Sequence, residues 1–238
     1  MVGTYNGPTH DAPGHTLGGY SEQIVVHERF VLRVSHAREQ LAAVAPLLCA
    51  GITTYSPLRH WKVGRGDQLA VVGLGGLGHM AVKIGAALGA EVTVLSHSEK
   101  KQKDAKRLGA ADFVVVSDSA ALVSLDRRFD FILDTVSAPH DMDAYLETLK
   151  TDGTLMLVGA PDQPFALDAF SLVLRRRRLV GSLIGGIDEI QEMLGFCARH
   201  RIPADVEVIP IQKVNDAYER MLRGDVRYRF VIDMQSLK

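Results

Sequence analysis

The chain has 238 residues, a formal net charge of −1 at pH 7 and a hydrophobic fraction of 47%. These values are typical of a globular protein with one large domain or two modest ones. The near-neutral charge argues against nucleic acid or anionic membranes as partners, and no apolar stretch reaches the roughly 20 residues of a membrane helix. Because the sequence has two cysteines and no signal peptide, we expect a cytoplasmic protein without a disulfide framework.

The N-terminal region differs in composition from the rest. Glycine and proline interrupt residues 1–20, and a β-like stretch follows over Ser21–Val34. Residues 37–55 are rich in alanine and predict a helix.

Residues 69–101 contain the most informative pattern. The apolar run at 69–72 predicts a strand, a Gly-x-Gly-x-x-Gly motif occupies 73–78, apolar residues at helical spacing follow, and 92–95 predicts a second strand. This motif between a strand and a helix is typical of a dinucleotide-binding site. The alternative is a glycine turn of a parallel sheet that binds nothing.

The three glycines have separable roles. Gly73 permits the tight turn, Gly75 lets the backbone approach a pyrophosphate, and Gly78 lets the helix pack closely on the strand. The pyrophosphate would lie at the helix N-terminus, where free N–H groups and the helix dipole favour an anion. The residues predicted to contact it are Gly73, Leu74, Gly75, Gly76, Leu77 and Gly78.

The end of the second strand indicates which cofactor binds. An NAD site expects an acidic residue about 20 positions after the last glycine to bind the ribose 2′-hydroxyl. Here Ser96 stands 18 residues after Gly78, and His97, Ser98 and Lys101 follow. Hydroxyls and cations suit the 2′-phosphate of NADP. In the alternative, Ser96 and Glu99 form only the capping box of the next helix.

The remaining pattern predicts a doubly wound α/β fold. Strands alternate with helices, which is typical of a parallel sheet with right-handed crossovers. Beyond the first two, the expected strands are 113–116, 129–134, 154–159 and 179–184. A helix over 187–200, a strand over 206–210, a helix over 214–223 and a strand over 228–233 complete the chain.

Seven segments carry a resemblance to a known family. They are GTYNGPTHDAPGHTLGGYSEQIVVHERFVLRV (3–34), PLLCAGITTYSPL (46–58), GLGGLG (73–78), SHSEKK (96–101), FDFILDTVSAPH (129–140), GSLIGG (181–186) and DVRYRFVIDM (225–234). Over its whole length the chain resembles the zinc-dependent medium-chain alcohol dehydrogenases, in their cinnamyl-alcohol-dehydrogenase-like, NADP-dependent branch. The resemblance implies a Rossmann NADP-binding domain over residues 49–185. Residues 1–48 and 186–238 would form the remnant of a β-rich, GroES-like catalytic domain.

The resemblance also implies which residues contact the cofactor. Thr53 would lie on the nicotinamide side, and the residues from Ser96 to Lys101 would hold the adenosine 2′-phosphate. The rest of the groove would be lined by Thr135, Gly159, Ser182, Leu183 and Ile184.

Catalysis in the family depends on zinc. The metal is held by Cys, His and a second Cys, leaving one position for the oxygen of an alcohol or aldehyde. As a Lewis acid it stabilises the developing alkoxide while hydride moves to or from the nicotinamide. By resemblance Cys49 is the last of these ligands. The first Cys and the His of a Gly-His-Glu segment are expected upstream of Met1, so the catalytic residues are unknown in this chain.

Other histidines and the second cysteine are weaker candidates for zinc ligands. His10, His15 and His27 are interpreted as surface histidines. Cys197 lies among apolar residues of a predicted helix, and we interpret it as a packed thiol.

Three functions are compatible with the sequence. The first is the family reaction, hydride transfer between NADP(H) and a primary alcohol or aldehyde. The second is an NADPH-binding module with impaired catalysis, and the third is a zinc-independent enone or quinone reductase, which Cys49 in its family context disfavours. A homodimer is expected, because Leu179–Ile184 resembles the edge strand through which the family's cofactor domains pair.

Overall fold

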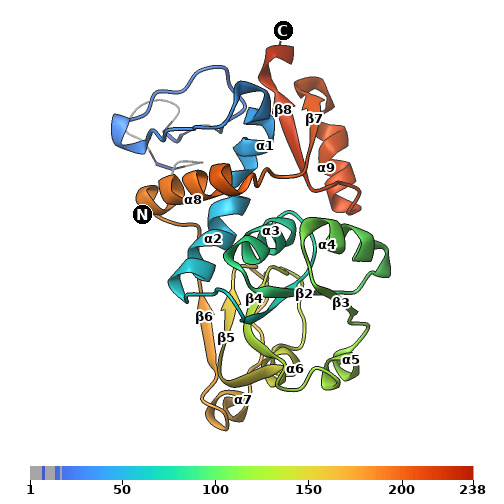
Figure 1. The fold of residues 1–238 in the computed structure, drawn as a ribbon. Helices are drawn as coiled ribbons and strands as arrows, with labels where there is room; N and C mark the ends of the chain where they lie inside the picture. Colours follow the sequence, from blue (N-terminus) through green and yellow to red (C-terminus); the bar gives the residue numbers. More distant parts are fainter. Residues whose placement is uncertain (1–6, 9–13, 17, 238) are drawn as a thin grey trace.

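The computed structural model describes residues 7–8, 14–16 and 18–237. At its centre is a parallel sheet of six strands in the order β3-β2-β1-β4-β5-β6 (Figure 1). The strands are β1 (Gln68–Val72), β2 (Glu91–Ser96), β3 (Asp112–Val115), β4 (Phe129–Asp134), β5 (Leu149–Leu157) and β6 (Arg178–Gly181). The strand order reverses between β1 and β4, and open α/β sheets bind ligands at such a point. The predicted fold class is confirmed.

Helices cover both faces of this sheet. Consecutive residues of β1 alternate between two cores, with Leu69 and Val71 in one and Ala70 and Val72 in the other. The first core is completed by α2 (Ala50–His60), α3 (Gly78–Leu88), α4 (Gln102–Leu108) and α8 (Ile187–His200). The second is completed by α5 (Ser119–Val123), α6 (Met142–Glu147) and α7 (Ala169–Val173).

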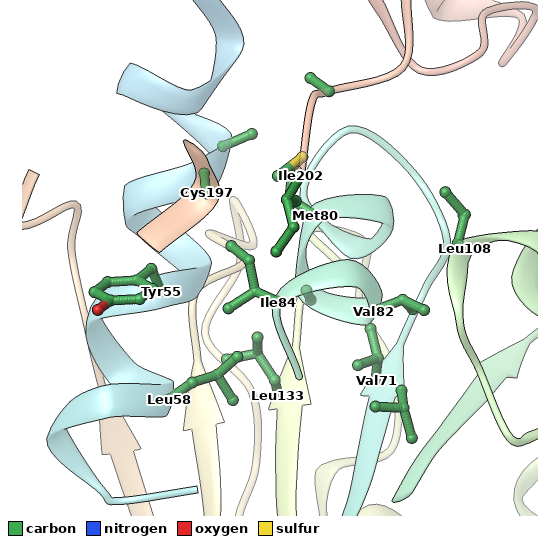
Figure 2. Packing of buried hydrophobic residues seen from close by; sticks show 14 of the residues in the cluster. Tyr55, Leu58, Val71, Met80, Val82, Ile84, Leu108, Leu133, Cys197 and Ile202 are labelled. Atoms are coloured by element: carbon green, nitrogen blue, oxygen red, sulfur yellow. The ribbon is translucent and has the colours of Figure 1, made fainter. Parts of the chain in front are cut away.

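The first core joins segments that are distant in the sequence. Figure 2 shows Leu58 of α2, Ile84 of α3 and Leu133 of β4 among the same buried side chains. All three are 0% exposed. Burial of such side chains is the main stabilising contribution to a domain, and it fixes α3 against the sheet that carries the glycine turn.

A second, smaller sheet lies at the C-terminal end of the chain. It pairs β7 (Val206–Pro210) with β8 (Arg229–Asp233) in parallel, and α9 (Val214–Leu222) connects them. Figure 1 shows this unit beside α1 (Leu41–Val44), at the end of the molecule where α8 lies. The predictions for 187–200 and 206–210 are confirmed at both ends. The helix and strand predicted after them are each one residue shorter than expected.

The strand expected over Ser21–Val34 does not form. This segment is irregular apart from a 3₁₀ turn at Glu28–Phe30. Ile24 and Val25 are 70% and 100% exposed. A strand must pair its backbone N–H and C=O groups with a neighbouring strand, and no strand among the described residues pairs with this segment. The prediction was therefore wrong for this part of the chain.

The helix predicted over 37–55 is interrupted. A 3₁₀ turn (Arg38–Gln40), α1 and a second 3₁₀ turn (Ala45–Leu48) precede α2, which begins at Ala50 and continues to His60. Pro46 has no amide hydrogen to donate to the preceding turn, which explains the break. Among the six strands of the large sheet, only β4 has both predicted ends, and the largest differences are that β5 begins at Leu149 and β6 ends at Gly181.

Among the described residues, no single helix is long and apolar enough to cross a membrane. The segments Arg38–Leu48 and Ala50–His60 meet the length and composition test only as a pair bent by 61°. Residues 50–58 of that pair are buried in the protein core.

Candidate functional site

The glycine turn between β1 and α3 has little room for side chains. Gly73 has a φ of +84°, a conformation that favours glycine. A Cβ on Gly78 would lie 2.1 Å from the carbonyl oxygen of Gly73. The backbone at these two positions therefore requires glycine, as the motif predicted.

The two glycines in the middle of the turn, Gly75 and Gly76, have different surroundings. A Cβ on Gly75 would meet nothing within 4 Å, so the backbone there is open to an approaching group. A Cβ on Gly76 would lie 2.5 Å from Nε of Arg229, the first residue of β8. That Nε is buried and has no hydrogen-bond partner among the described residues. A guanidinium whose Nε has no hydrogen-bond partner among the described residues therefore packs on the glycine turn.

A cavity of about 240 Å³ lies at the carboxyl ends of β1, β2 and β4. Six of the predicted cofactor residues line one part of it: Gly73, Leu74, Ser96, His97, Ser98 and Lys101. The opposite wall includes Val136, His140 and Tyr145. The fold thus brings the end of β2 and the start of the glycine turn to one cavity.

The end of β2 carries hydroxyls and a cation. Ser96 is 6% exposed, and its Oγ accepts a hydrogen bond from the backbone N–H of Ser98 at 3.3 Å. Nζ of Lys101 donates to the carbonyl oxygen of Leu74 at 2.9 Å. Burial, with a smaller contribution from the charge of Arg227, lowers the pKa of Lys101. An anion in the cavity would raise the pKa of Lys101 and so oppose the contributions of burial and of Arg227.

The capping-box alternative for Ser96 and Glu99 is not found. The 3₁₀ turn Glu99–Lys101 has Ser98 as its N-cap, and the Ser98 side chain makes no capping hydrogen bond. The Ser96 hydroxyl accepts a hydrogen bond from the Ser98 N–H instead, in the lining of the cavity.

His140 of the cavity lining pairs with a buried carboxylate that is not itself part of the lining. Asp134, at the end of β4, is 1% exposed, and its Oδ2 lies 3.0 Å from Nε2 of His140. Nδ1 of His140 is 2.9 Å from the carbonyl oxygen of Ala138. Both ring nitrogens therefore face acceptors, which favours the imidazolium. Asp134 raises the pKa of His140 above its usual value of 6.5.

This pair predicts a pH dependence of stability. Because the folded-state pKa of His140 is raised, the stabilisation is fully present below pH 6.5 and is lost as the pH rises through the folded-state pKa. We expect His140→Gln to lower the free energy of unfolding on the order of 1 kcal/mol at pH 6, and less at pH 9. Urea unfolding across this range, with the exposed His60→Gln as control, measures it. A pH-independent difference between the variants would contradict the role of the pair.

The other predicted cofactor residues lie outside the cavity lining. Thr135 donates through Oγ1 to the carbonyl oxygen of Val72 at 2.7 Å, which ties β4 to the start of the turn. A Cβ on Gly159 would lie 2.1 Å from the carbonyl oxygen of Val136. Thr53 is 7% exposed within α2. Ser182, Leu183 and Ile184 follow β6, where Leu183 is 69% and Ile184 41% exposed.

Cys49 lies at a different cavity. It is exposed, immediately before α2, and lines a cavity of about 360 Å³ together with Tyr20, Tyr218 and Arg229. Within the described ranges, no group of three or more His, Cys, Asp or Glu residues could hold a metal ion. The described residues therefore do not form a complete zinc site around Cys49.

The remaining candidate ligands that the structure describes do not belong to a metal-binding group. His15 pairs with Pro8 in an isolated bridge, and His27 accepts a hydrogen bond through Nδ1 from the N–H of Arg29. Cys197 is buried, and burial raises the pKa of its thiol to about 12. It is a packed thiol, as predicted. His10 lies outside the described residues.

Sequence reasoning missed His140, Tyr145 and Arg229. For His140 a signal was available, because polar residues that follow the carboxyl end of a parallel strand are expected near the ligand crevice. For Arg229 there was no local signal. It lies in a short strand far from the glycine turn in sequence, and only the folded chain brings the two together.

Comparisons with known proteins support one family. The family described as "Zinc-binding dehydrogenase" matches residues 76–199. Aldehyde reductase YahK of Escherichia coli (strain K12) is 59% identical over 238 residues, covering 100% of this chain and 68% of that protein. NADP-dependent alcohol dehydrogenase C 1 of Mycolicibacterium smegmatis is 55% identical over 239 residues, covering 100% of this chain and 68% of that protein.

Comparisons with solved structures support the same family. A cinnamyl alcohol dehydrogenase from Sorghum bicolor matches with a TM-score of 0.90 and 44% identity, covering 97% of this chain and 66% of that one. The structure of CAD from Helicobacter pylori complexed with NADP(H) matches with a TM-score of 0.84 and 40% identity, covering 94% of this chain and 64% of that one. This chain thus spans about two thirds of the length of these relatives. The predicted family is confirmed: the chain belongs to the zinc-dependent medium-chain alcohol dehydrogenases, in the branch that resembles cinnamyl alcohol dehydrogenases.

Proposed function

We propose that the chain binds NADP(H) and serves hydride transfer between this cofactor and a primary alcohol or aldehyde. The observation that carries the proposal is the cavity at the end of β2. Ser96, Ser98 and Lys101 line it, and no carboxylate is found among its lining residues in the described part of the chain. Hydroxyls and a cation suit a 2′-phosphate, whereas the ribose 2′-hydroxyl of NAD is usually bound by an acidic residue.

The residues around the turn fit the rest of this cofactor. The open backbone at Gly75 and the N-terminus of α3 offer N–H groups to a pyrophosphate. Arg229 would add a cation over the same turn. Thr53 is proposed to lie on the nicotinamide side, and Thr135, Gly159 and residues 182–184 are proposed to line the rest of the cofactor groove. When bound, the cofactor supplies or accepts the hydride, and these residues hold it in place.

Arg229 gives a direct test of this arrangement. We expect Arg229→Met to raise the Kd for NADPH about 10- to 100-fold, because a hydrogen bond to a charged group contributes about 1.5–3 kcal/mol. Titration followed by nicotinamide fluorescence measures the Kd. The matched control is Arg223→Met, an arginine 65% exposed at the end of α9. Equal Kd values for Arg229→Met and Arg223→Met would show that Arg229 does not contribute to NADPH binding.

Turnover is tested separately from binding. The described residues do not complete the zinc site around Cys49. We expect the purified chain to bind NADPH at least tenfold more tightly than NADH, in line with the charge argument. NADPH oxidation by aliphatic and cinnamyl-type aldehydes, with and without added zinc, then measures activity. Equal affinity for both cofactors would contradict the proposal.

A second candidate function is NADPH binding without turnover by this chain alone. It is favoured by Cys49, which belongs to no group of three or more potential metal ligands among the described residues. Binding that persists without turnover when zinc is supplied would support this candidate. Turnover comparable to that of the relatives would rule it out.

We also propose a homodimer that forms through β6. In the described structure this strand pairs only with β5, so its other edge is free to continue the sheet. Exposed apolar side chains lie near it: Val173 and Leu174 at the end of α7 are 67% and 74% exposed. Light scattering at micromolar concentration should give a mass of two chains for the native protein, and of one chain for Leu174→Glu.

We propose the domain limits from the order of the elements, and a cytoplasmic location from the state of the cysteines. Residues 49–185 hold α2, the six-stranded sheet and the cavity, and 186–238 return to the N-terminal region through α8 and the second sheet. Both cysteines are free, which suits a reducing compartment such as the cytoplasm.

A further inference from the structure

His79 is a fully buried histidine at the start of α3 that the proposed reaction does not use. It follows Gly78 directly and is 0% exposed. Its ring stacks on Tyr228, with centroids 4.9 Å apart and an interplanar angle of 16°. A buried polar ring is stabilised only when its nitrogens have partners.

Both ring nitrogens of His79 have backbone partners. Nε2 lies 3.3 Å from the backbone N of Asp205, and Nδ1 lies 3.2 Å from the carbonyl oxygen of Gly75. Because a backbone N–H can only donate, Nε2 accepts, and Nδ1 therefore carries the proton and donates to Gly75. This arrangement requires the neutral imidazole. Burial lowers the pKa of His79 to about 4, so the ring is neutral at pH 7.

These partners belong to two different parts of the fold. Gly75 is the open position of the glycine turn, whereas Asp205 directly precedes β7 and Tyr228 directly precedes β8. The N–H of Tyr228 donates to the carbonyl oxygen of Asp205 at 3.0 Å. His79 thus lies between the turn and the first residues of both strands of the second sheet.

Charged groups hold the same junction from the surrounding elements. Lys83 of α3 and Arg107 of α4 both bind the carboxylate of Asp205, the latter at 2.6 Å. Asp104 of α4 accepts a hydrogen bond from the hydroxyl of Tyr228 at 2.9 Å. Arg229 follows Tyr228 and reaches over Gly76. Protonation of His79 would therefore place a third positive charge beside Lys83 and Arg229. It would also place a proton on Nε2, which faces the N–H of Asp205.

We propose that His79 is a positioning residue that joins the glycine turn to the β7–β8 sheet and thereby sets Arg229 over the site of the cofactor pyrophosphate. The inference rests on the proposed NADP(H) site, but it makes a separate statement about the ligand-free protein. His79 acts through Gly75, Asp205 and Tyr228 and is not itself required to touch the cofactor.

The first experiment needs no cofactor. In His79→Phe the ring can still stack on Tyr228, but both hydrogen bonds are lost. We expect hydrogen exchange in residues 73–80 and 205–209 to accelerate about tenfold relative to the native chain, as local opening becomes easier. The matched control, His200→Phe, changes an exposed histidine that contacts Phe196 at the end of α8. Unchanged hydrogen exchange in both segments of His79→Phe would overturn the proposal, whether or not the chain binds NADPH.

The second experiment asks whether His79 acts through Arg229. NADPH is titrated against the native chain, His79→Phe, Arg229→Met and the double variant. We expect His79→Phe to raise the Kd about tenfold in the native background and less than twofold in the Arg229→Met background, because coupled residues are not additive. His79→Gln, whose amide can both donate and accept, should recover part of the loss. Equal effects in the two backgrounds would overturn the proposal, whereas a native chain that does not bind NADPH would overturn the proposed function instead.

Discussion

Gly78→Ala is expected to abolish measurable NADPH binding and to lower the free energy of unfolding by about 3 kcal/mol, the upper part of the range for overpacking. The added Cβ would lie 2.1 Å from the carbonyl oxygen of Gly73, and this neighbour is backbone that cannot rotate away. Helix α3 would have to move from β1, and the turn would open. Urea unfolding and NADPH titration measure the two effects.

Two further glycine variants separate stability from binding. A Cβ on Gly75 meets nothing within 4 Å, so Gly75→Ala should leave stability within about 1 kcal/mol of native while raising the Kd for NADPH about tenfold, because the second glycine of the motif admits the pyrophosphate. Gly64→Ala is the control away from the turn, where the nearest atom to a Cβ is 3.9 Å distant. Native affinity in Gly78→Ala would show that the turn is not the cofactor site.

Ser96→Asp is expected to reverse the cofactor preference. The substitution places a carboxylate at the end of β2, where it would repel a 2′-phosphate but accept a hydrogen bond from a 2′-hydroxyl. Like charges in a binding site cost several kcal/mol, so the Kd for NADPH should rise about 100-fold while NADH binding is retained or improved.

The neutral variant Ser96→Asn controls for size. Because Ser96 is only 6% exposed, a larger side chain by itself could disturb the cavity. Ser96→Asn should lose less than about tenfold in NADPH affinity, since it has the shape of Asp without the charge. Equal losses of NADPH affinity in Ser96→Asp and Ser96→Asn would show that side-chain size, and not charge, causes the effect. A native preference for NADPH in Ser96→Asp would contradict the proposed phosphate position.

Much of the cofactor half of the fold follows from local sequence patterns. The strand at 129–134 and, directly after this half, the helix at 187–200 have the predicted ends, because their apolar spacing and flanking residues act over short distances. The glycine turn was equally predictable. Its steric requirement arises within six consecutive residues, and the close approach of Gly78 to Gly73 is part of the motif itself.

The N-terminal region was predicted poorly for a physical reason. The apolar stretch 21–34 has the composition of a strand, but a strand is stabilised by a neighbouring strand and by side chains packed against its face. Among the described residues, no strand pairs with it, and Val25 is 100% exposed. Composition alone carries no information on whether that partner exists.

The sequence by itself determined the family, the parallel sheet and the hydroxyl and lysine side chains at the end of β2, because these depend on motifs and on spacing between near neighbours. Only the tertiary structure decided what surrounds the glycine turn. The contact of His79 with Asp205 joins residues 126 positions apart, and Arg229 reaches Gly76 from the second sheet. Such contacts depend on how α3, β7 and β8 pack together, and no periodicity or local motif encodes that packing.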